Sequence, residues 1–242
     1  MKKLKVGFKS AYGRSHGRIS SFHREAGHKK VYCLIDFSRN FINIIGKIKF
    51  IKKDGYRTGY VAGILYTNGY FSYMLALEGM QVGNFIFNKV HNFEHTNQDK
   101  IGLSCPLRYV KIGEKISNIE YFPGTGGKLA RSAGLFAIIV KKYTNNVLIK
   151  LSSGEFRLFF LNCMCTIGQI SNSKHHEKVK KKAGVNRILG WRPVVRGRAM
   201  NPVDHPHGGR TNGGIAPRTP WGFLTRGVKT VKNKKACIVK KK

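Results

Sequence analysis

Residues 60–77 read YVAGILYTNGYFSYMLAL, and they hold two short apolar and aromatic runs, residues 60–66 and 70–77. Runs of this kind, bounded by Gly, Asn or Pro, are typical of β-strands. Three neighbouring runs share the pattern, at residues 31–37, 42–51 and 84–87. Five candidate strands at such close spacing indicate a small β-barrel.

A second series of strand-like runs follows Cys105 and Pro106. Its members are short and mostly apolar, and they lie at residues 107–112, 116–122, 135–141, 147–151, 156–161 and 166–170. Two consecutive small barrels fit the two series better than one sheet, with a boundary near residues 98–106. The sequence therefore predicts a mostly β protein.

Outside these two series, little in the chain predicts a packed structure. The best helical candidate, residues 174–183, is mostly Lys and His, so a stable helix there requires an anionic partner. Beyond residue 190, Gly, Pro, Arg and Asn dominate and the apolar periodicity disappears. We predict four parts, a basic amino-terminal arm, two barrels and a basic carboxy-terminal extension, at residues 1–30, 31–104, 105–175 and 176–242.

The 242 residues carry 45 Lys and Arg against 11 Asp and Glu, which is a formal net charge of +34. A soluble domain usually has a net charge of roughly 2–8 in magnitude. The excess lies mostly near the ends, because residues 171–242 contain 19 basic and two acidic side chains, whereas residues 61–170 contain 11 and six. A hydrophobic content of 41% excludes a fully disordered basic chain. The protein therefore requires a polyanion as its partner.

Neither a membrane span nor a disulfide framework is predicted. The longest apolar run, residues 135–140, is far too short to cross a bilayer, and no apolar leader follows the first residues. Five scattered cysteines indicate no disulfide pattern. Cys163 and Cys165 have no second ligand pair at zinc spacing, so we expect two structural thiols on a strand in a reducing compartment.

Two glycine-rich basic segments are candidates for nucleic-acid contacts. Residues 12–30 interleave Arg, Lys and His with Gly and hydroxyl side chains, which suits close approach to a sugar-phosphate chain. Residues 121–134 resemble a phosphate-binding loop, but the required Gly and Lys spacing and a following helical pattern are absent. We therefore reject nucleotide hydrolysis and expect this loop to lay Lys128 and Arg131 along a backbone.

A third segment, residues 195–210, places Asp204, His205 and His207 within four positions. General acid–base catalysis needs a positioned group beside a pocket, and this stretch has no apolar framework to make one. A metal site needs more ligands than the scarce acidic residues supply. An extended strand through RNA fits better, and the alternatives are an enzyme that acts on RNA and a nonspecific polycation.

The motif AMNPVDHPHGG at residues 199–209 closely resembles the signature of the universal large-subunit ribosomal protein family numbered two, in its bacterial and organellar form. Other segments agree with this family in the same order, at residues 17–30, 35–37, 123–134, 153–155, 166–168 and 220–222. The resemblance implies an oligonucleotide-binding-type (OB-like) barrel, then an SH3-like barrel, then an extension buried in RNA near the peptidyl transferase region.

The same resemblance implies a structural constituent of the large ribosomal subunit, which binds ribosomal RNA, supports subunit assembly and is not an enzyme. Peptide-bond formation is attributed to RNA, so we expect a structural RNA contact from His205. Resemblance and charge together predict an RNA-binding set of Arg14, Arg18, His23, Arg24, His28, Lys29, Lys30, Arg39, Lys128, Arg131, Arg187, Arg192, Arg196, Arg198, Asn201, His205, His207, Arg210, Trp221 and Arg226.

Two positions depart from the family pattern. Glu25 and Ala26 stand where glycines are common, which predicts a less close approach of the backbone to RNA there. Arg210 follows the second glycine of the motif where bacterial members have another glycine, which predicts a lineage-specific RNA contact.

The implied partners are large-subunit ribosomal RNA and neighbouring ribosomal proteins, with the small subunit at the intersubunit face as a further candidate. No homo-oligomer is expected, and no cofactor or metal site beyond magnesium ions associated with the RNA. The excess of Lys, Ile, Phe and Asn suggests an A+T-rich organellar genome. We therefore predict the mitochondrial matrix, in the mitochondrial ribosome, with a plastid-type organelle or the bacterial cytoplasm as the alternative.

Overall fold

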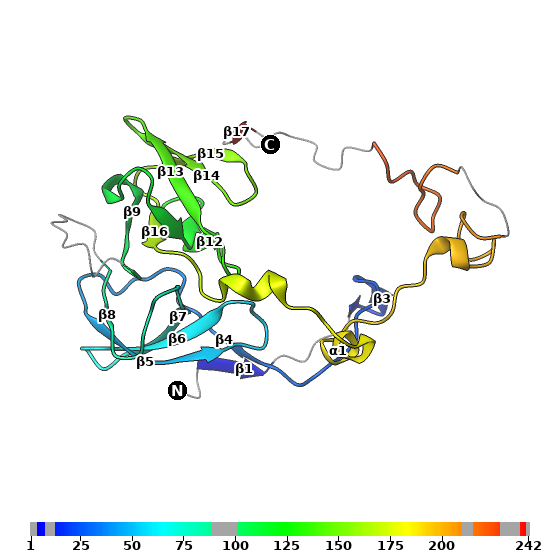
Figure 1. The fold of residues 1–242 in the computed structure, drawn as a ribbon, viewed down its shortest axis with the longest axis horizontal. Helices are drawn as coiled ribbons and strands as arrows, with labels where there is room; N and C mark the ends of the chain where they lie inside the picture. The colour runs from blue at the N-terminus through cyan, green and yellow to red at the C-terminus, as the bar shows by residue number, and fades with distance from the viewer. Residues whose placement is uncertain (1–3, 8–12, 89–100, 210–214, 228–237, 241–242) are drawn as a thin grey trace. The chain divides into compact units, whose positions relative to one another are not determined.

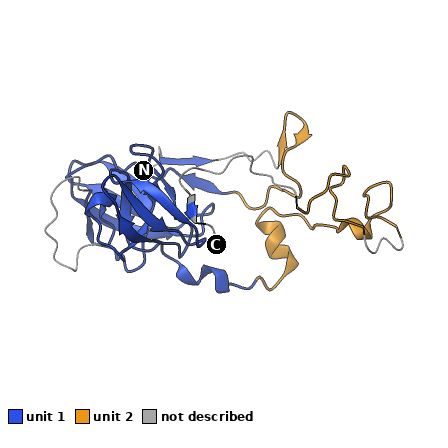
Figure 2. Ribbon diagram, turned by 90° about the horizontal axis from the view of Figure 1, so that it is seen from above, with its two compact units in different colours: residues 1–8, 30–179, 235–242 blue, residues 9–29, 180–234 orange. Residues whose placement is uncertain are grey.

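The computed structural model describes residues 4–7, 13–88, 101–209, 215–227 and 238–240. The chain divides into two compact units, which Figure 2 colours separately. Unit 1 comprises residues 1–8, 30–179 and 235–242, and unit 2 comprises residues 9–29 and 180–234. Strands greatly outnumber helices in the described residues, so the prediction of a mostly β protein is confirmed.

The first β-domain of unit 1 is built on a four-stranded antiparallel sheet (Figure 1). Its strands run in the order β7-β6-β5-β8, with bounds Phe71–Leu75, Tyr60–Tyr66, Gly46–Lys53 and Phe85–Ile86. On β5, Lys47 and Lys49 are exposed and Ile48 is buried, which is the two-residue period of a strand with one face on the core. Beside it, β1 (Lys5–Gly7) pairs with β4 (Val31–Cys33).

The second β-domain contains a seven-stranded antiparallel sheet in the order β17-β15-β14-β13-β10-β16-β9. The bounds in that order are Ile238–Lys240, Phe156–Phe160, Asn146–Lys150, Ala137–Lys142, Lys115–Ser117, Met164–Ile167 and Ser104–Pro106. A separate pair joins β11 (Ile119–Glu120) to β12 (Gly127–Leu129). Both sheets are curled, as expected of the OB-like and SH3-like barrels of the family that the sequence resembles.

Each β-domain has a hydrophobic core of its own. In the first, β5 and β6 bury Ile48 and Ile64 with neighbours from β7 and β8. In the second, fifteen buried residues form one cluster, in which Ile139 and Ile149 are fully buried. A third, small cluster joins the domains, where Leu77 forms a bridge with Ile170.

Unit 2 has very little regular structure. It contains the short strands β2 (Arg14–Ser15) and β3 (Arg18–Ile19), the helix α1 (Ala183–Ile188) and a 3-10 turn, η4 (Gly197–Ala199). None of its described residues has a hydrophobic side chain that is buried. This agrees with the prediction that the region beyond residue 190 cannot build a core.

One local prediction is wrong. Residues 107–112 do not form a strand, because β9 ends at Pro106 and Leu107–Tyr109 then form a 3-10 helix that buries Leu107. Residues 174–183, where a stable helix was expected only with an anionic partner, do not form a continuous helix. Ser173–Glu177 make a 3-10 helix without a side-chain cap, and the lysine-rich segment after it has no apolar stripe to pack.

Candidate nucleic-acid interface

Within the amino-terminal arm, β2 and β3 form a tight hairpin. His16 and Gly17 at its tip have φ angles of 48° and 75°, the left-handed conformation required at both central residues of a type I′ turn. The base is closed by Ser20 and Ser21, whose backbone N–H groups donate to the Gly13 carbonyl at 2.7 and 3.0 Å. The hairpin therefore presents Arg14 and Arg18, both exposed, on a short rigid loop.

The arm packs on a segment from the distant, carboxy-terminal part of the chain. The Glu25 N–H donates to the Gly190 carbonyl and the His28 N–H to the Ile188 carbonyl, each at 2.9 Å. The Arg192 N–H donates in turn to the His23 carbonyl at 2.9 Å. The basic residues 9–29 and 180–234, which the sequence analysis placed in separate parts of the chain, therefore belong to one unit.

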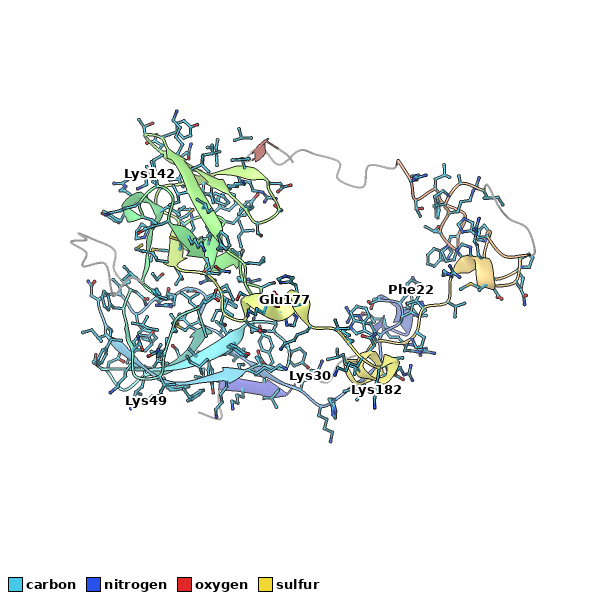
Figure 3. All side chains as sticks on the ribbon, viewed as in Figure 1. Phe22, Lys30, Lys49, Lys142, Glu177 and Lys182 are labelled. Atoms are coloured by element: carbon cyan, nitrogen blue, oxygen red, sulfur yellow. The ribbon has the colours of Figure 1, made fainter. Side chains whose placement is uncertain are left out.

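Two predicted RNA-binding arginines have partners within this unit. The Arg24 guanidinium lies 3.5 Å from the centre of the Trp191 ring, a cation–π contact. Arg187 forms an ion pair with Glu25, with 3.0 Å between Nη1 and Oε2. Glu25, one of the departures from the family pattern, thus holds α1 against the arm. An exposed aromatic pair lies in the same unit, since the Phe22 ring (Figure 3) is centred 5.7 Å from that of Trp221.

The motif around His205 is a compact loop held by its own backbone. The Asn201 carbonyl accepts from the N–H groups of Asp204 and His205, and the Gly208 N–H donates to the His205 carbonyl at 2.8 Å. His205 is only 8% exposed, and its Nδ1 accepts from the His207 N–H at 3.0 Å. A Cβ at position 197 would lie 2.5 Å from that nitrogen, so Gly197 is needed for the ring to fit.

This arrangement is suited to shaping a loop rather than to acid–base chemistry. His205 Nδ1 is engaged with the backbone, and Asp204 is exposed. His207 Nε2 accepts from the Arg218 N–H at 3.1 Å. Among the residues that the structure describes, no three His, Cys, Asp or Glu side chains are grouped as metal ligands.

The glycine-rich loop of the second β-domain presents two of the predicted cations. Lys128 is exposed on β12, and Arg131 is exposed just after it. The Arg131 guanidinium lies 4.6 Å from the centre of the Phe37 ring, and its Nη1 donates to the Gly127 carbonyl at 3.3 Å. Aromatic stacking and a hydrogen bond therefore fix the direction of this arginine.

Arg39 was predicted to bind RNA, and the structure corrects this. The residue is 3% exposed, with Nε donating to Asn88 Oδ1 at 2.8 Å and Nη2 to the Gly102 carbonyl at 3.1 Å. Burial lowers the pKa of this guanidinium, although Tyr66 and Asp36 act in the opposite direction. Arg39 thus links Asn88 of the first β-domain to Gly102, which lies at the boundary between the two β-domains. An arginine next to a strand offers no sequence signal of this role.

The cysteines of the second β-domain are buried, and of the two that were predicted on a strand, Cys165 lies on β16 whereas Cys163 does not. Cys105 on β9 and Cys165 on β16 face each other across the sheet, and both are buried. Cys163 lies just before β16, and burial raises the pKa of its thiol to about 11. The Cys105 thiol and burial likewise raise the pKa of Cys165. The thiols of Cys163 and Cys165 therefore stay protonated at neutral pH.

Exposure separates the remaining predicted residues. His23, Lys30 and His207 are half-buried, and Arg210 lies outside the described residues. The exposed members, in addition to those placed above, are His28, Lys29, Arg192, Arg196, Arg198, Asn201, Trp221 and Arg226. Most of the predicted set therefore lies at the surface of unit 2.

These features together define a class of protein, in which small β-domains carry long basic segments for binding RNA. Comparison with known proteins identifies the family. Residues 1–88 match the model described as the RNA-binding N-terminal domain of Ribosomal Proteins L2, and residues 100–222 match the model of their C-terminal domain. The chain belongs to the ribosomal protein L2 family.

Curated relatives support this assignment over the full length of the chain. Large ribosomal subunit protein uL2 of Rickettsia canadensis (strain McKiel) is 48% identical over 250 residues, covering 100% of this chain and 89% of the relative. The protein of the same name from Rickettsia akari (strain Hartford) is 47% identical over 251 residues, with the same coverage. Members of this family are structural constituents of the large ribosomal subunit that bind ribosomal RNA, and they are not enzymes.

In the part of the chain that the structure describes, no helix is both long and apolar enough to cross a bilayer.

Proposed function

We propose that the exposed cations of unit 2, together with Lys128 and Arg131 of unit 1, bind large-subunit ribosomal RNA and hold it in its assembled form near the peptidyl transferase region. One observation carries this proposal. Unit 2 contains 18 of the 45 Lys and Arg but no buried hydrophobic side chain among its described residues. A segment of this kind gains too little from apolar burial to offset its ordering entropy, so an anionic partner must supply the difference.

The proposed RNA-binding set follows the sequence prediction with one removal, Arg39, which is buried. Arg24 and Arg187 contribute both charge to the surface and internal contacts. His205 contributes by shaping the loop in which Arg198, Asn201 and the backbone approach RNA.

The four-part division of the chain, with boundaries after residues 30, 104 and 175, stays a proposal. It is supported by the start of β4 at Val31 and by the two separate cores of unit 1. The arm and the extension are then the two chain segments that contact RNA most extensively.

Ribosomal RNA and ribosomal proteins are the partners of this family. We propose in addition a contact with the small subunit at the intersubunit face, and magnesium ions held by the bound RNA rather than by the protein. Magnesium sites in proteins are built on carboxylates, and the scarcity of acidic residues, 11 in 242, supports this assignment of the ions.

We propose that the chain works in a mitochondrial ribosome, which is supported by its excess of Lys, Ile, Phe and Asn. The bacterial relatives favour the alternative, a ribosome in bacterial cytoplasm. Fractionation of the source cells, with mass spectrometry of ribosomes from the organelle and from the cytosol, separates the two. Recovery only in non-organellar ribosomes would contradict the mitochondrial assignment.

The RNA-binding proposal is tested by the salt dependence of affinity. Each phosphate contact contributes about −0.7 to −0.9 to the slope of log affinity against log salt concentration. The double variant Arg196→Ala and Arg198→Ala should therefore lower the magnitude of the slope by about 1.4–1.8 on cognate large-subunit ribosomal RNA transcribed in vitro.

The matched control is Lys49→Ala, which removes an exposed charge on β5 of the first β-domain (Figure 3). Its slope should equal that of the wild-type chain. An affinity of the wild-type chain that is indifferent to salt would refute the proposal. Equal binding to any polyanion, with loss from large subunits after a high-salt wash, would favour the nonspecific polycation instead.

A further inference from the structure

The glycine-rich loop at residues 121–127 has an acidic residue beneath it that the proposed function does not use. Glu120 lies on β11 and is 2% exposed. A carboxylate this deeply buried is costly unless hydrogen bonds or charges compensate it.

Three backbone N–H groups donate to the Glu120 carboxylate. The Gly126 N–H donates to Oε1 at 2.9 Å, and the N–H groups of Gly124 and Met164 donate to Oε2 at 3.2 and 2.9 Å. Gly124 and Gly126 have φ angles of 79° and 69°, which glycine adopts without strain. Backbone N–H groups that converge in this way form a concave site for an anion.

The other backbone donors of the loop are also used internally. The Phe122 N–H donates to Thr125 Oγ1 at 3.4 Å, and the Thr125 N–H returns to the Phe122 carbonyl at 3.2 Å. The Gly127 N–H donates to the carbonyl of Phe37, in the first β-domain, at 3.0 Å. Because Pro123 has no N–H, every backbone donor from residue 122 to residue 127 has an acceptor within the chain. The loop keeps none of these donors for an RNA phosphate.

We propose that Glu120 is a positioning residue, whose carboxylate is an internal anion that fixes this loop and so aims Lys128 and Arg131 at RNA phosphates. The proposal rests on the proposed function, because it assumes that these two side chains contact RNA. It also accounts for the likeness of the loop to a phosphate-binding loop. The concave backbone site exists, but the protein's own carboxylate occupies it.

The main test replaces Glu120 by Gln in the full chain, because Gln keeps the size but offers an N–H group where one acceptor oxygen stood. Loss of one aligned phosphate contact should weaken binding to cognate large-subunit ribosomal RNA by about tenfold at about 0.1 M salt. The slope against log salt should fall in magnitude by about 0.7–0.9. The matched control is Glu155→Gln, which loses an ion pair with Arg157 elsewhere in the domain and should bind as wild type.

A merely structural role for Glu120 is distinguished by repeating the substitution in the Lys128→Ala and Arg131→Ala background. If Glu120 acts through these cations, Glu120→Gln costs no further affinity there. An equal loss in both backgrounds, or unchanged binding in the wild-type background, would overturn the inference. If the Lys128 and Arg131 variant binds as wild type while the Arg196 and Arg198 variant does not, the inference fails and the proposed function stands only for the cations of unit 2.

Amide hydrogen exchange of the wild-type chain provides a test that does not depend on how the Gln variant folds. The Gly124 and Gly126 amides should be protected equally in the free chain and in the RNA complex, because Glu120 accepts from both in either state. Fast exchange in the free chain and protection only in the complex would mean that RNA occupies the loop, contrary to the proposal.

Discussion

The second β-domain and unit 2 are held together by different forces. The β-domain buries fifteen residues in one cluster and pairs seven strands around it. Unit 2 has no buried hydrophobic side chain among its described residues, and its contacts include backbone hydrogen bonds, an arginine–tryptophan stack and an ion pair. We therefore expect the first kind of structure to be stable by itself and the second to depend on a partner that neutralises its charge.

Cation–π contacts and exposed ion pairs each contribute at most about 1 kcal/mol. Burial of one large aliphatic side chain contributes about 1.5–3 kcal/mol. The difference in stability that we expect between the second β-domain and unit 2 therefore follows from their amino-acid composition. The following predictions test it, from the largest expected effect to the smallest.

The largest effect is expected in the core of the second β-domain. Ile139→Ala removes a fully buried side chain from β13 and should lower the free energy of unfolding by about 2–5 kcal/mol. Urea denaturation followed by far-ultraviolet circular dichroism measures this change. The control is Val203→Ala in unit 2, where the residue is 90% exposed. A surface substitution of this kind should change the free energy of unfolding by at most about ±0.5 kcal/mol. Similar losses for the two variants would remove the contrast between the units.

The next effect is expected at Arg39. Arg39→Met keeps much of the volume but leaves Asn88 Oδ1 and the Gly102 carbonyl without their donors, which should cost about 2–3 kcal/mol of stability. The slope of RNA affinity against salt should not change, because the side chain is buried. A smaller slope in the folded variant would return Arg39 to the RNA-binding set.

A moderate effect is expected where the arm meets the extension in unit 2. Gly190 has a φ of 92°, and a Cβ there would lie 2.6 Å from the Glu25 carbonyl oxygen. Gly190→Ala should therefore loosen this contact by about 1–2 kcal/mol, seen as faster exchange of the Glu25 amide and altered Trp191 fluorescence. Gly184→Ala is the control, since it has open space in α1 and alanine favours helix. Equal behaviour of the two variants would mean that the contact does not hold the arm.

The smallest effect concerns pH and is expected at Cys163 of the second β-domain. Cys163 holds its proton in the folded chain up to a pKa of about 11, whereas the ordinary pKa of a cysteine thiol is 9.0. The folded state therefore binds more protons than the unfolded state between these values, and stability is lost as pH rises from 9 towards 11. Thermal unfolding across pH 8–10.5 should show a declining midpoint, and Cys163→Ala should decline less. A midpoint that rises with pH would contradict this assignment.

Much of the β structure could be predicted because the strands are short apolar runs with clear borders. The bounds of β6 coincide with the predicted residues 60–66, since nearly all of that strand is buried and its composition is uniform. The prediction was wrong at residues 107–112, where Leu107 and Val110 are buried by a 3-10 turn and the residue after it instead of by a strand. Local composition reports burial, and it does not distinguish a buried strand from a buried turn.

The candidate interface was predictable in outline and not in detail. The motif around His205 and the basic segments identified the family and the kind of partner. No pattern in the sequence predicts three features of the structure. These are the burial of Arg39, the stack of Arg24 on Trp191 and the three donors to Glu120. Each depends on residues that are far apart along the chain or on backbone direction.

The sequence by itself determined that two β-barrels carry segments of extreme positive charge, because hydrophobic runs and charge are properties of local composition. It also determined the family through a contiguous motif. Only the tertiary structure decided which cations are available to RNA and which serve the fold. That choice depends on the acceptors and rings that folding brings beside each side chain, as Asn88 beside Arg39 and Phe37 beside Arg131 demonstrate.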